Sequence, residues 1–322
     1  MTEQEESRQM QSCRLCPREC GADRSAGQRG RCQMTARLTA ARAALHMWEE
    51  PCLSGEEGSG AVFFSGCALG CVYCQNQEIA SGRAGKEISV NRLAEIFLTL
   101  QEKQANNINL VTAGHFLFPV VRALERAKTQ GLRIPVVYNS SGYEKTEALR
   151  MLEGLVDIYL PDMKYRSPEL SGRYSAAPDY FDVAAKALEE MVRQVCAKTE
   201  RPQRKEPGNG PELSGTVFDS RGQMRRGVIV RHLQLPGCLE DSKKVIRYLY
   251  ETYGDRIYIS ILNQYTPPKQ MSRFPELNRR VTKREYDRLV DYAIGLGVEN
   301  GFIQEGRTAL ASFIPAFDLE GV

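Results

Sequence analysis

Three closely spaced cysteines are the residues of this sequence best suited to chemistry. Cys67, Cys71 and Cys74 have the spacing C-x3-C-x2-C. Thiolates are soft ligands that suit iron–sulfur clusters and zinc. Three thiolates on one loop can hold three corners of a cubane and leave its fourth iron free to bind a substrate or a cofactor. A zinc site completed by a distant ligand, or thiols that bind nothing, are the alternatives.

A second group of four cysteines lies near the N-terminus. It consists of Cys13, Cys16, Cys20 and Cys32. Their segment lacks a core of its own, and small segments of this kind often need a metal to fold. Zinc, a second iron–sulfur cluster and no metal at all remain open. The other three cysteines stand alone and are most simply core or loop thiols, although the first could join either site: Cys52, Cys196 and Cys238.

Composition restricts the class of protein. The 322 residues include 43 Lys and Arg against 40 Asp and Glu, a net charge of +3 that is too even to argue for nucleic acid or an anionic membrane as partner on bulk charge alone. With 42% hydrophobic and 26% charged residues, a globular chain is expected. No apolar stretch of about 18 residues and no secretory signal is recognised. We therefore expect a cytoplasmic protein whose thiols are metal ligands or core residues rather than disulfides.

Short apolar strands alternate with amphipathic helices along the chain. Strands are predicted over residues 61–64, 108–111, 134–138, 156–160, 228–233 and 257–262. Helices are predicted over residues 89–100, 119–128, 145–152, 180–195, 241–250 and 283–294. This alternation predicts parallel βα units, in a barrel or a doubly wound sheet, with ligands at the carboxyl ends of the strands. Cys67 follows the first strand, where a cofactor loop is expected.

The three-cysteine loop, with Tyr73 before its last cysteine, resembles the motif of the radical S-adenosylmethionine (SAM) superfamily. Seven further runs resemble the group related to pyruvate formate-lyase activating enzyme: residues 49–55, 63–67, 74–76, 159–165, 230–237, 260–267 and 300–305. The resemblance implies an α/β fold, a partial (β/α)6 barrel of the radical SAM type with a cysteine-rich N-terminal extension. Its regions would be residues 1–55 (extension), 56–305 (barrel, with an exposed insertion near 200–226) and 306–322 (tail). A small hairpin is predicted within 216–222.

The same resemblance implies a chemistry. Cys67, Cys71 and Cys74 would hold a [4Fe–4S] cluster whose open iron is chelated by SAM. One electron, from a donor such as flavodoxin or ferredoxin, would cleave SAM and release a 5′-deoxyadenosyl radical. That radical would abstract hydrogen from a glycyl radical enzyme or another protein, a peptide, an RNA or a small molecule. The motifs do not define the substrate, and no catalytic residue is assigned.

Five further residues, beside Tyr73, are expected around SAM from the resemblance: Thr112, Asn139, Asp162, Lys164 and Arg231. The family usually has a Gly-Gly-Glu type segment after the second strand, which receives the SAM ammonium. Here residues 112–115 read Thr-Ala-Gly-His and offer no carboxylate. His115 could face the cofactor or be packed, and His232 is expected to be structural.

A cysteine-rich zinc protein that binds nucleic acid or a protein partner is the competing hypothesis. Basic residues at 201–205 and 223–226 are its only support. Solvated loops commonly have that composition.

Overall fold

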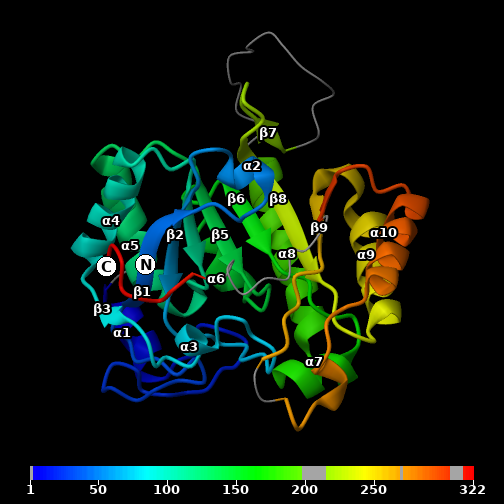
Figure 1. Cartoon of the computed structure of the whole chain (residues 1–322). Coiled ribbons are helices and arrows are strands. Elements are labelled where there is room, and N and C mark those ends of the chain that lie inside the picture. Colours follow the sequence, from blue (N-terminus) through cyan, green and yellow to red (C-terminus); the bar gives the residue numbers. More distant parts are fainter. Residues whose placement is uncertain (1–2, 198–214, 269–270, 305–314) are drawn as a thin grey trace.

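The computed structural model describes residues 3–197, 215–268, 271–304 and 315–322. One sheet forms its centre, and six of its strands are parallel neighbours (Figure 1). In spatial order they are β2 (Ser59–Phe64), β4 (Ile108–Val111), β5 (Val136–Ser140), β6 (Ile158–Pro161), β8 (Met224–Leu233) and β9 (Tyr258–Leu262). Their order in space follows their order in the chain, as expected when helices cross over between parallel strands.

The sheet has two edges rather than closing on itself. β10 (Gly301–Ile303) pairs parallel with β9 at one edge. At the other edge β1 (Thr39–His46) pairs antiparallel with β2, and β3 (Lys86–Glu87) pairs with β1. Within the described residues, the path of paired strands ends at β10 and β3. The predicted partial (β/α)6 barrel, rather than a doubly wound sheet, is confirmed.

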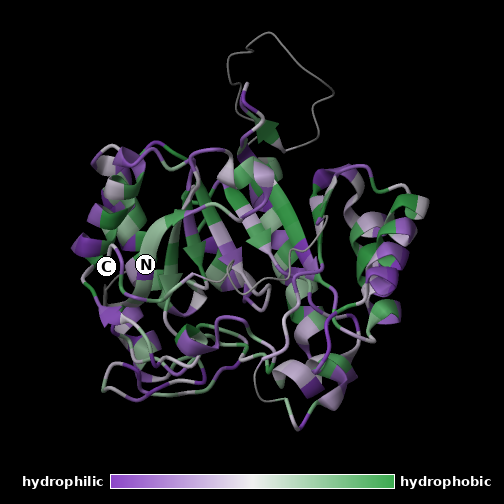
Figure 2. Cartoon of the chain, viewed as in Figure 1, coloured by the Kyte–Doolittle hydropathy of each residue, from purple (hydrophilic) through white to green (hydrophobic). Residues whose placement is uncertain are grey.

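Helices cover the outside of the sheet between successive strands (Figure 1). They are α4 (Val90–Glu102), α5 (Leu117–Thr129), α6 (Thr146–Arg150), α8 (Tyr180–Ala197), α9 (Leu239–Tyr253) and α10 (Lys283–Leu296). α7 (Pro168–Ser175) lies instead at the carboxyl ends of the strands, beside the three-cysteine loop. In α4 the Ser89 hydroxyl caps the helix by accepting a hydrogen bond from the Arg92 backbone N–H. Figure 2 shows that the strands are mainly hydrophobic and that the outer faces of the helices are more hydrophilic.

Several elements escape the sequence prediction. α1 (Glu3–Gln11) and β1 fall in the cysteine-rich segment, for which no regular period was recognised. β1 reads TAARAALH, so its buried positions are mostly alanines rather than the β-branched residues that mark a strand. Asn139 was expected after a strand ending at residue 138, but β5 starts and ends two residues later and includes it.

The insertion predicted near 200–226 is only partly within the described residues. Residues 198–214, with the basic stretch at 201–205, lie outside them. β7 (Val217–Phe218) pairs antiparallel with β8, which is the predicted hairpin. Met224, at the start of β8, is buried. Residues 224–226 therefore belong to a strand of the barrel and not to an exposed insertion.

α2 (Pro51–Ser54) lies at the amino-terminal end of the barrel. Asn107 lies just before β4 begins, and its side-chain amide donates a hydrogen bond to the Leu53 carbonyl at 2.9 Å. Cys52 and Leu53 pack with apolar residues from β5, β6 and β8. Cys52 is therefore part of the core at the floor of the barrel rather than a member of either cysteine group. No described helix is long and apolar enough to cross a membrane.

Candidate active site

A cavity of about 500 Å³ lies inside the barrel and opens at the carboxyl ends of the strands. It is lined by all nine site residues predicted for the cluster and SAM: Cys67, Cys71, Tyr73, Cys74, Thr112, Asn139, Asp162, Lys164 and Arg231. A more open hollow of about 590 Å³ beside α7 and α9 contains none of them. The tertiary structure thus brings together residues that are up to 164 positions apart in the chain.

The three-cysteine loop follows β2 directly. All three thiols are half-buried. Burial and the neighbouring Cys67 and Cys71 thiols together raise the pKa of Cys74 to about 12, so the three groups lie close to one another. The Ser175 hydroxyl donates to Cys71 Sγ at 3.0 Å. Three soft donors on one loop beside a cavity fit three corners of an iron–sulfur cluster.

These thiols are not arranged around a single ion. Among the described residues, no three His, Cys, Asp or Glu side chains converge as ligands of one metal ion. A cluster of several irons spreads its ligands more widely than a lone zinc does, because each thiolate binds a different iron. The donor set fits a cluster because thiolates are soft ligands that suit iron–sulfur clusters.

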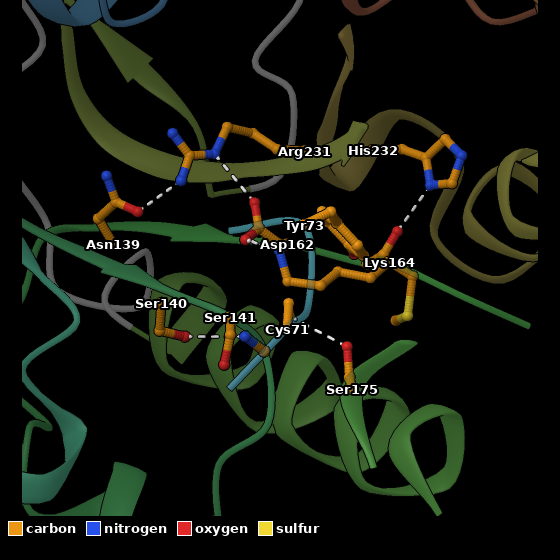
Figure 3. A network of polar contacts seen from close by, with 12 residues as sticks. Cys71, Tyr73, Asn139, Ser140, Ser141, Asp162, Lys164, Ser175, Arg231 and His232 are labelled. Carbon is orange, nitrogen blue, oxygen red and sulfur yellow. Dashed lines mark hydrogen bonds and ion pairs between the residues drawn. The ribbon is translucent and has the colours of Figure 1, made fainter. Parts of the chain in front are cut away.

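An ion-pair network crosses the cavity at the ends of β6 and β8 (Figure 3). Asp162 Oδ2 lies 2.6 Å from Lys164 Nζ, and Asp162 Oδ1 lies 3.3 Å from Arg231 Nε. Although burial alone would raise the pKa of Asp162, Lys164 and Arg231 hold it below its usual value. Arg231 also donates to the Asn139 side-chain oxygen. The network presents both positive and negative groups to the cavity, as a ligand that carries charges of both signs requires.

Two carboxylates in the cavity were not predicted as site residues. Glu49 and Glu50 precede α2 and line the cavity together. Glu49 Oε2 lies 3.2 Å from Arg231 Nη1, and Glu49 Oε1 accepts from Asn109 Nδ2 at 3.0 Å. Burial raises the pKa of both glutamates, against the lowering effect of Arg231. Residues 49–55 are one of the runs that resemble the activating-enzyme group, but that run does not by itself show that these two carboxylates enter the barrel.

Tyr73 and Thr112 complete the wall. Tyr73 is buried, and its hydroxyl accepts a hydrogen bond from the Tyr165 hydroxyl at 2.7 Å. Thr112 has a φ of 61° at the carboxyl end of β4. A β-branched residue in the left-handed region is strained, and such strain gathers at functional sites. Its backbone N–H donates to the Asn139 carbonyl at 2.9 Å, which joins the ends of β4 and β5.

The two histidines considered from sequence are structural. His115 Nε2 lies 2.6 Å from the Ser65 carbonyl, and burial lowers its pKa to about 3. His232 is buried on the far side of β8, with Nδ1 2.7 Å from the Met163 carbonyl (Figure 3). Neither lines the cavity.

The four N-terminal cysteines lie outside the cavity. Cys13, Cys16 and Cys32 are buried, and Cys20 is exposed. Their segment lies at the carboxyl ends of the strands, below α3 (Gln77–Ala80) in Figure 1. The backbone N–H of Cys67 donates to the Cys32 carbonyl at 3.2 Å, so the two cysteine groups are in direct contact through the backbone.

Comparison with known proteins finds a family model that matches part of the chain. Residues 61–198 match the family model of the radical SAM superfamily. An uncharacterised protein of Methanocaldococcus jannaschii is 26% identical over 291 residues, which is 88% of this chain and 74% of that protein.

Solved structures resemble the chain at lower identity. Streptococcus suis SuiB is 11% identical, with a TM-score of 0.47 over 78% of this chain and 49% of its own. A domain of pyruvate-formate lyase-activating enzyme from Bacteroides vulgatus is 11% identical, with a TM-score of 0.37 over 59% of this chain and 91% of its own. Methylornithine synthase is 12% identical, with a TM-score of 0.48 over 74% of this chain and 60% of its own. The chain thus spans about half the length of SuiB.

Proposed function

From the radical SAM superfamily domain that this chain carries over residues 61–198, we propose that the protein cleaves SAM reductively and uses the 5′-deoxyadenosyl radical to abstract hydrogen. The observation that carries the proposal is the sharing of one cavity by the three-cysteine loop and the Asp162, Lys164 and Arg231 network. A [4Fe–4S] cluster on Cys67, Cys71 and Cys74 would supply the electron when bound.

The charges of the cavity suit SAM. SAM carries a sulfonium, an ammonium and a carboxylate, and so has a net charge of +1. Three carboxylates line the cavity against two cations, which leaves one excess negative charge when all are ionised: Glu49, Glu50 and Asp162 against Lys164 and Arg231. We propose that Arg231 and Lys164 orient the SAM carboxylate and that the carboxylates receive its ammonium. Glu49 and Glu50 would then supply the negative charge that residues 112–115 lack.

Asn139, Thr112 and Tyr73 would complete the SAM site. Asn139 and Glu49 both contact Arg231, so they limit the positions its guanidinium can take. Tyr73 is held by Tyr165 at one side of the loop. A rigid surround of this kind keeps the reacting atoms close together and excludes water.

The proposal extends to the substrate as a glycyl radical enzyme or another protein or peptide segment. Among the described residues, no strand pairing joins β10 to β1 or β3 at the two ends of the sheet, and the cavity lining includes Trp48 beyond β1 and Ile303 of β10. These side chains are 62% and 51% exposed. Exposed apolar residues at the mouth of a cavity favour docking of a polypeptide over docking of a small polar molecule. Nucleic acid is disfavoured by the even charge balance.

The decisive experiment purifies the protein without oxygen and measures iron, acid-labile sulfide and zinc. We expect a brown protein that forms 5′-deoxyadenosine when SAM and dithionite are added. Cys67→Ala, Cys71→Ala and Cys74→Ala should each abolish this product, whereas the half-buried Cys238→Ala should not. A colourless zinc protein that leaves SAM intact would overturn the proposal.

The substrate is tested separately. The reduced enzyme with SAM is mixed with candidate glycyl radical enzymes and examined by electron paramagnetic resonance. A glycyl doublet that requires both Cys71 and SAM supports this class. SAM cleavage without such a signal, combined with hydrogen abstraction from an unrelated peptide, would exclude glycyl radical enzymes and retain the radical chemistry.

A further inference from the structure

We propose that Cys13, Cys16, Cys20 and Cys32 hold a metal centre of their own, ligated by thiolates and in contact with the three-cysteine loop. The proposal does not depend on SAM cleavage. It stands on three observations: the fold of the segment, a buried cation without an acidic partner, and the contact between the two cysteine groups.

Backbone hydrogen bonds fold the segment so that distant cysteines approach each other. The N–H of Cys13 donates to the Ala22 carbonyl, and the N–H of Gly21 donates back to the Cys13 carbonyl, both at 3.0 Å. A Cβ atom built on Gly30 would lie 3.3 Å from Cys20 Sγ and 3.4 Å from Cys32 Sγ. The two sulfurs therefore flank one glycine, although they are 12 positions apart. The four thiols, all within the described residues, do not converge on one ion as they stand, so side-chain rotation would have to bring them onto a common metal.

Arg24 is a buried cation beside these thiols. It is 1% exposed and donates to the carbonyls of Met34, Thr35 and His115 at 3.2, 2.7 and 2.8 Å. Its Nη1 also lies 3.7 Å from Cys13 Sγ. In the part of the chain that the structure describes, no carboxylate forms an ion pair with Arg24. The carbonyls satisfy its N–H groups but do not neutralise its charge.

A buried charge without a counter-ion is costly. Neutral thiols would leave Arg24 in that state. A metal bound by four thiolates carries net negative charge, whether it is Zn²⁺ or a [4Fe–4S] cluster, and so would compensate the guanidinium. A negatively charged metal centre beside Arg24 would also explain why an arginine is buried in a segment that has so little core of its own.

The centre would lie against the three-cysteine loop. The Cys67 N–H donates to the Cys32 carbonyl at 3.2 Å. A Cβ on Gly66 would come within 2.6 Å of that same carbonyl and 2.3 Å of Met34 Cγ, so nothing larger than glycine fits there. Loss of the N-terminal metal should therefore disturb the position of Cys67.

The first test removes the cluster ligands and asks what metal remains. The Cys67→Ala/Cys71→Ala/Cys74→Ala variant is purified without oxygen, and its iron, sulfide and zinc are measured. We expect metal to remain, as zinc or as iron with sulfide, and to be lost when Cys16→Ala and Cys32→Ala are added. A folded triple variant without zinc or iron, or one whose metal is unaffected by the added changes, would overturn the proposal.

The second test uses the unaltered protein, so its result does not depend on the folding of the variants. Cys20 is exposed, so a free thiol there would react rapidly with iodoacetamide. We expect alkylation of Cys20, followed by peptide mass spectrometry, to accelerate at least tenfold after a chelator or oxidant removes the metal. Cys238, half-buried and a member of neither cysteine group, is the control whose rate should not change. Rapid alkylation of Cys20 that the chelator does not alter would contradict a metal centre.

Discussion

Arg231 and Asp162 are paired twice, once through the backbone and once through the side chains. A parallel β-bridge joins them at the ends of β8 and β6, and Arg231 Nε lies 3.3 Å from Asp162 Oδ1. Arg231 thereby contacts carboxylates on both sides, because Glu49 lies 3.2 Å from its Nη1. The guanidinium holds together two acidic groups that would otherwise repel each other.

Replacing this arginine should damage both stability and SAM binding. Arg231→Gln leaves Glu49 buried without its cation and Asp162 with Lys164 alone, and breaking a buried pair of this kind costs roughly 3–5 kcal/mol. Denaturant unfolding and equilibrium dialysis of SAM measure the two effects. Arg225→Gln is the matched control: Arg225 lies on the same strand, half-exposed, and pairs with Asp219 at 3.5 Å. Equal losses for the two variants would contradict the role of Arg231.

The contact between the two cysteine groups can be tested at one glycine. Gly66→Ala places a methyl group 2.6 Å from the Cys32 carbonyl, at a φ of 88°. We expect loss of several kcal/mol in stability, on the scale of severe overpacking, together with reduced iron content. Gly70→Ala has a φ of 70° but nothing within 4 Å of the new methyl. It should therefore lose only about 1 kcal/mol from backbone strain. Iron analysis and thermal unfolding of both variants measure these two effects.

The Ser175 hydroxyl should tune the cluster. Hydrogen bonds to ligand sulfurs raise the reduction potential of iron–sulfur clusters, and Ser175 donates to Cys71 Sγ at 3.0 Å. Ser175→Ala should make the cluster harder to reduce and slow SAM cleavage by dithionite. Ser171→Ala, on the same helix, removes a hydroxyl that donates to the Pro168 carbonyl instead. A redox titration followed by electron paramagnetic resonance should show a lower potential for the first variant alone.

Glu144 should make the folded state less stable as pH rises. Burial raises its pKa to about 7 from an ordinary value of 4.5. The folded state therefore keeps a proton that the unfolded state releases, and stability falls between pH 4.5 and pH 7, by about 3 kcal/mol in all. Glu144→Gln removes this dependence, so it should be stabilising relative to the native protein at pH 8 and nearly neutral at pH 4.5. Urea unfolding at both pH values is the measurement; an equal difference at each would rule the effect out.

The choice of a barrel over a doubly wound sheet came from the family resemblance, but the sequence alone sufficed for the βα alternation and for the three-cysteine loop. Both depend on local patterns: apolar strands alternate with amphipathic helices, and three thiols share one short loop after the first strand. Such patterns act over a few residues, so they are visible without the fold. The carboxyl-end rule for parallel strands then placed Asp162 and Arg231 at one end of the barrel, on neighbouring strands.

The tertiary structure decided what depends on distant contacts. Glu49 and Glu50 enter the cavity because α2 caps the amino-terminal end of the barrel, a packing that their own neighbours in the chain do not specify. His115 is structural because its ring meets the Ser65 carbonyl. Arg24 lies beside Cys13 because its side chain also reaches the carbonyls of Met34, Thr35 and His115. The types and spacing of residues indicate which chemistry is available. Which charged groups come into contact depends on burial and on residues distant in the chain, and only the folded tertiary structure determines these contacts.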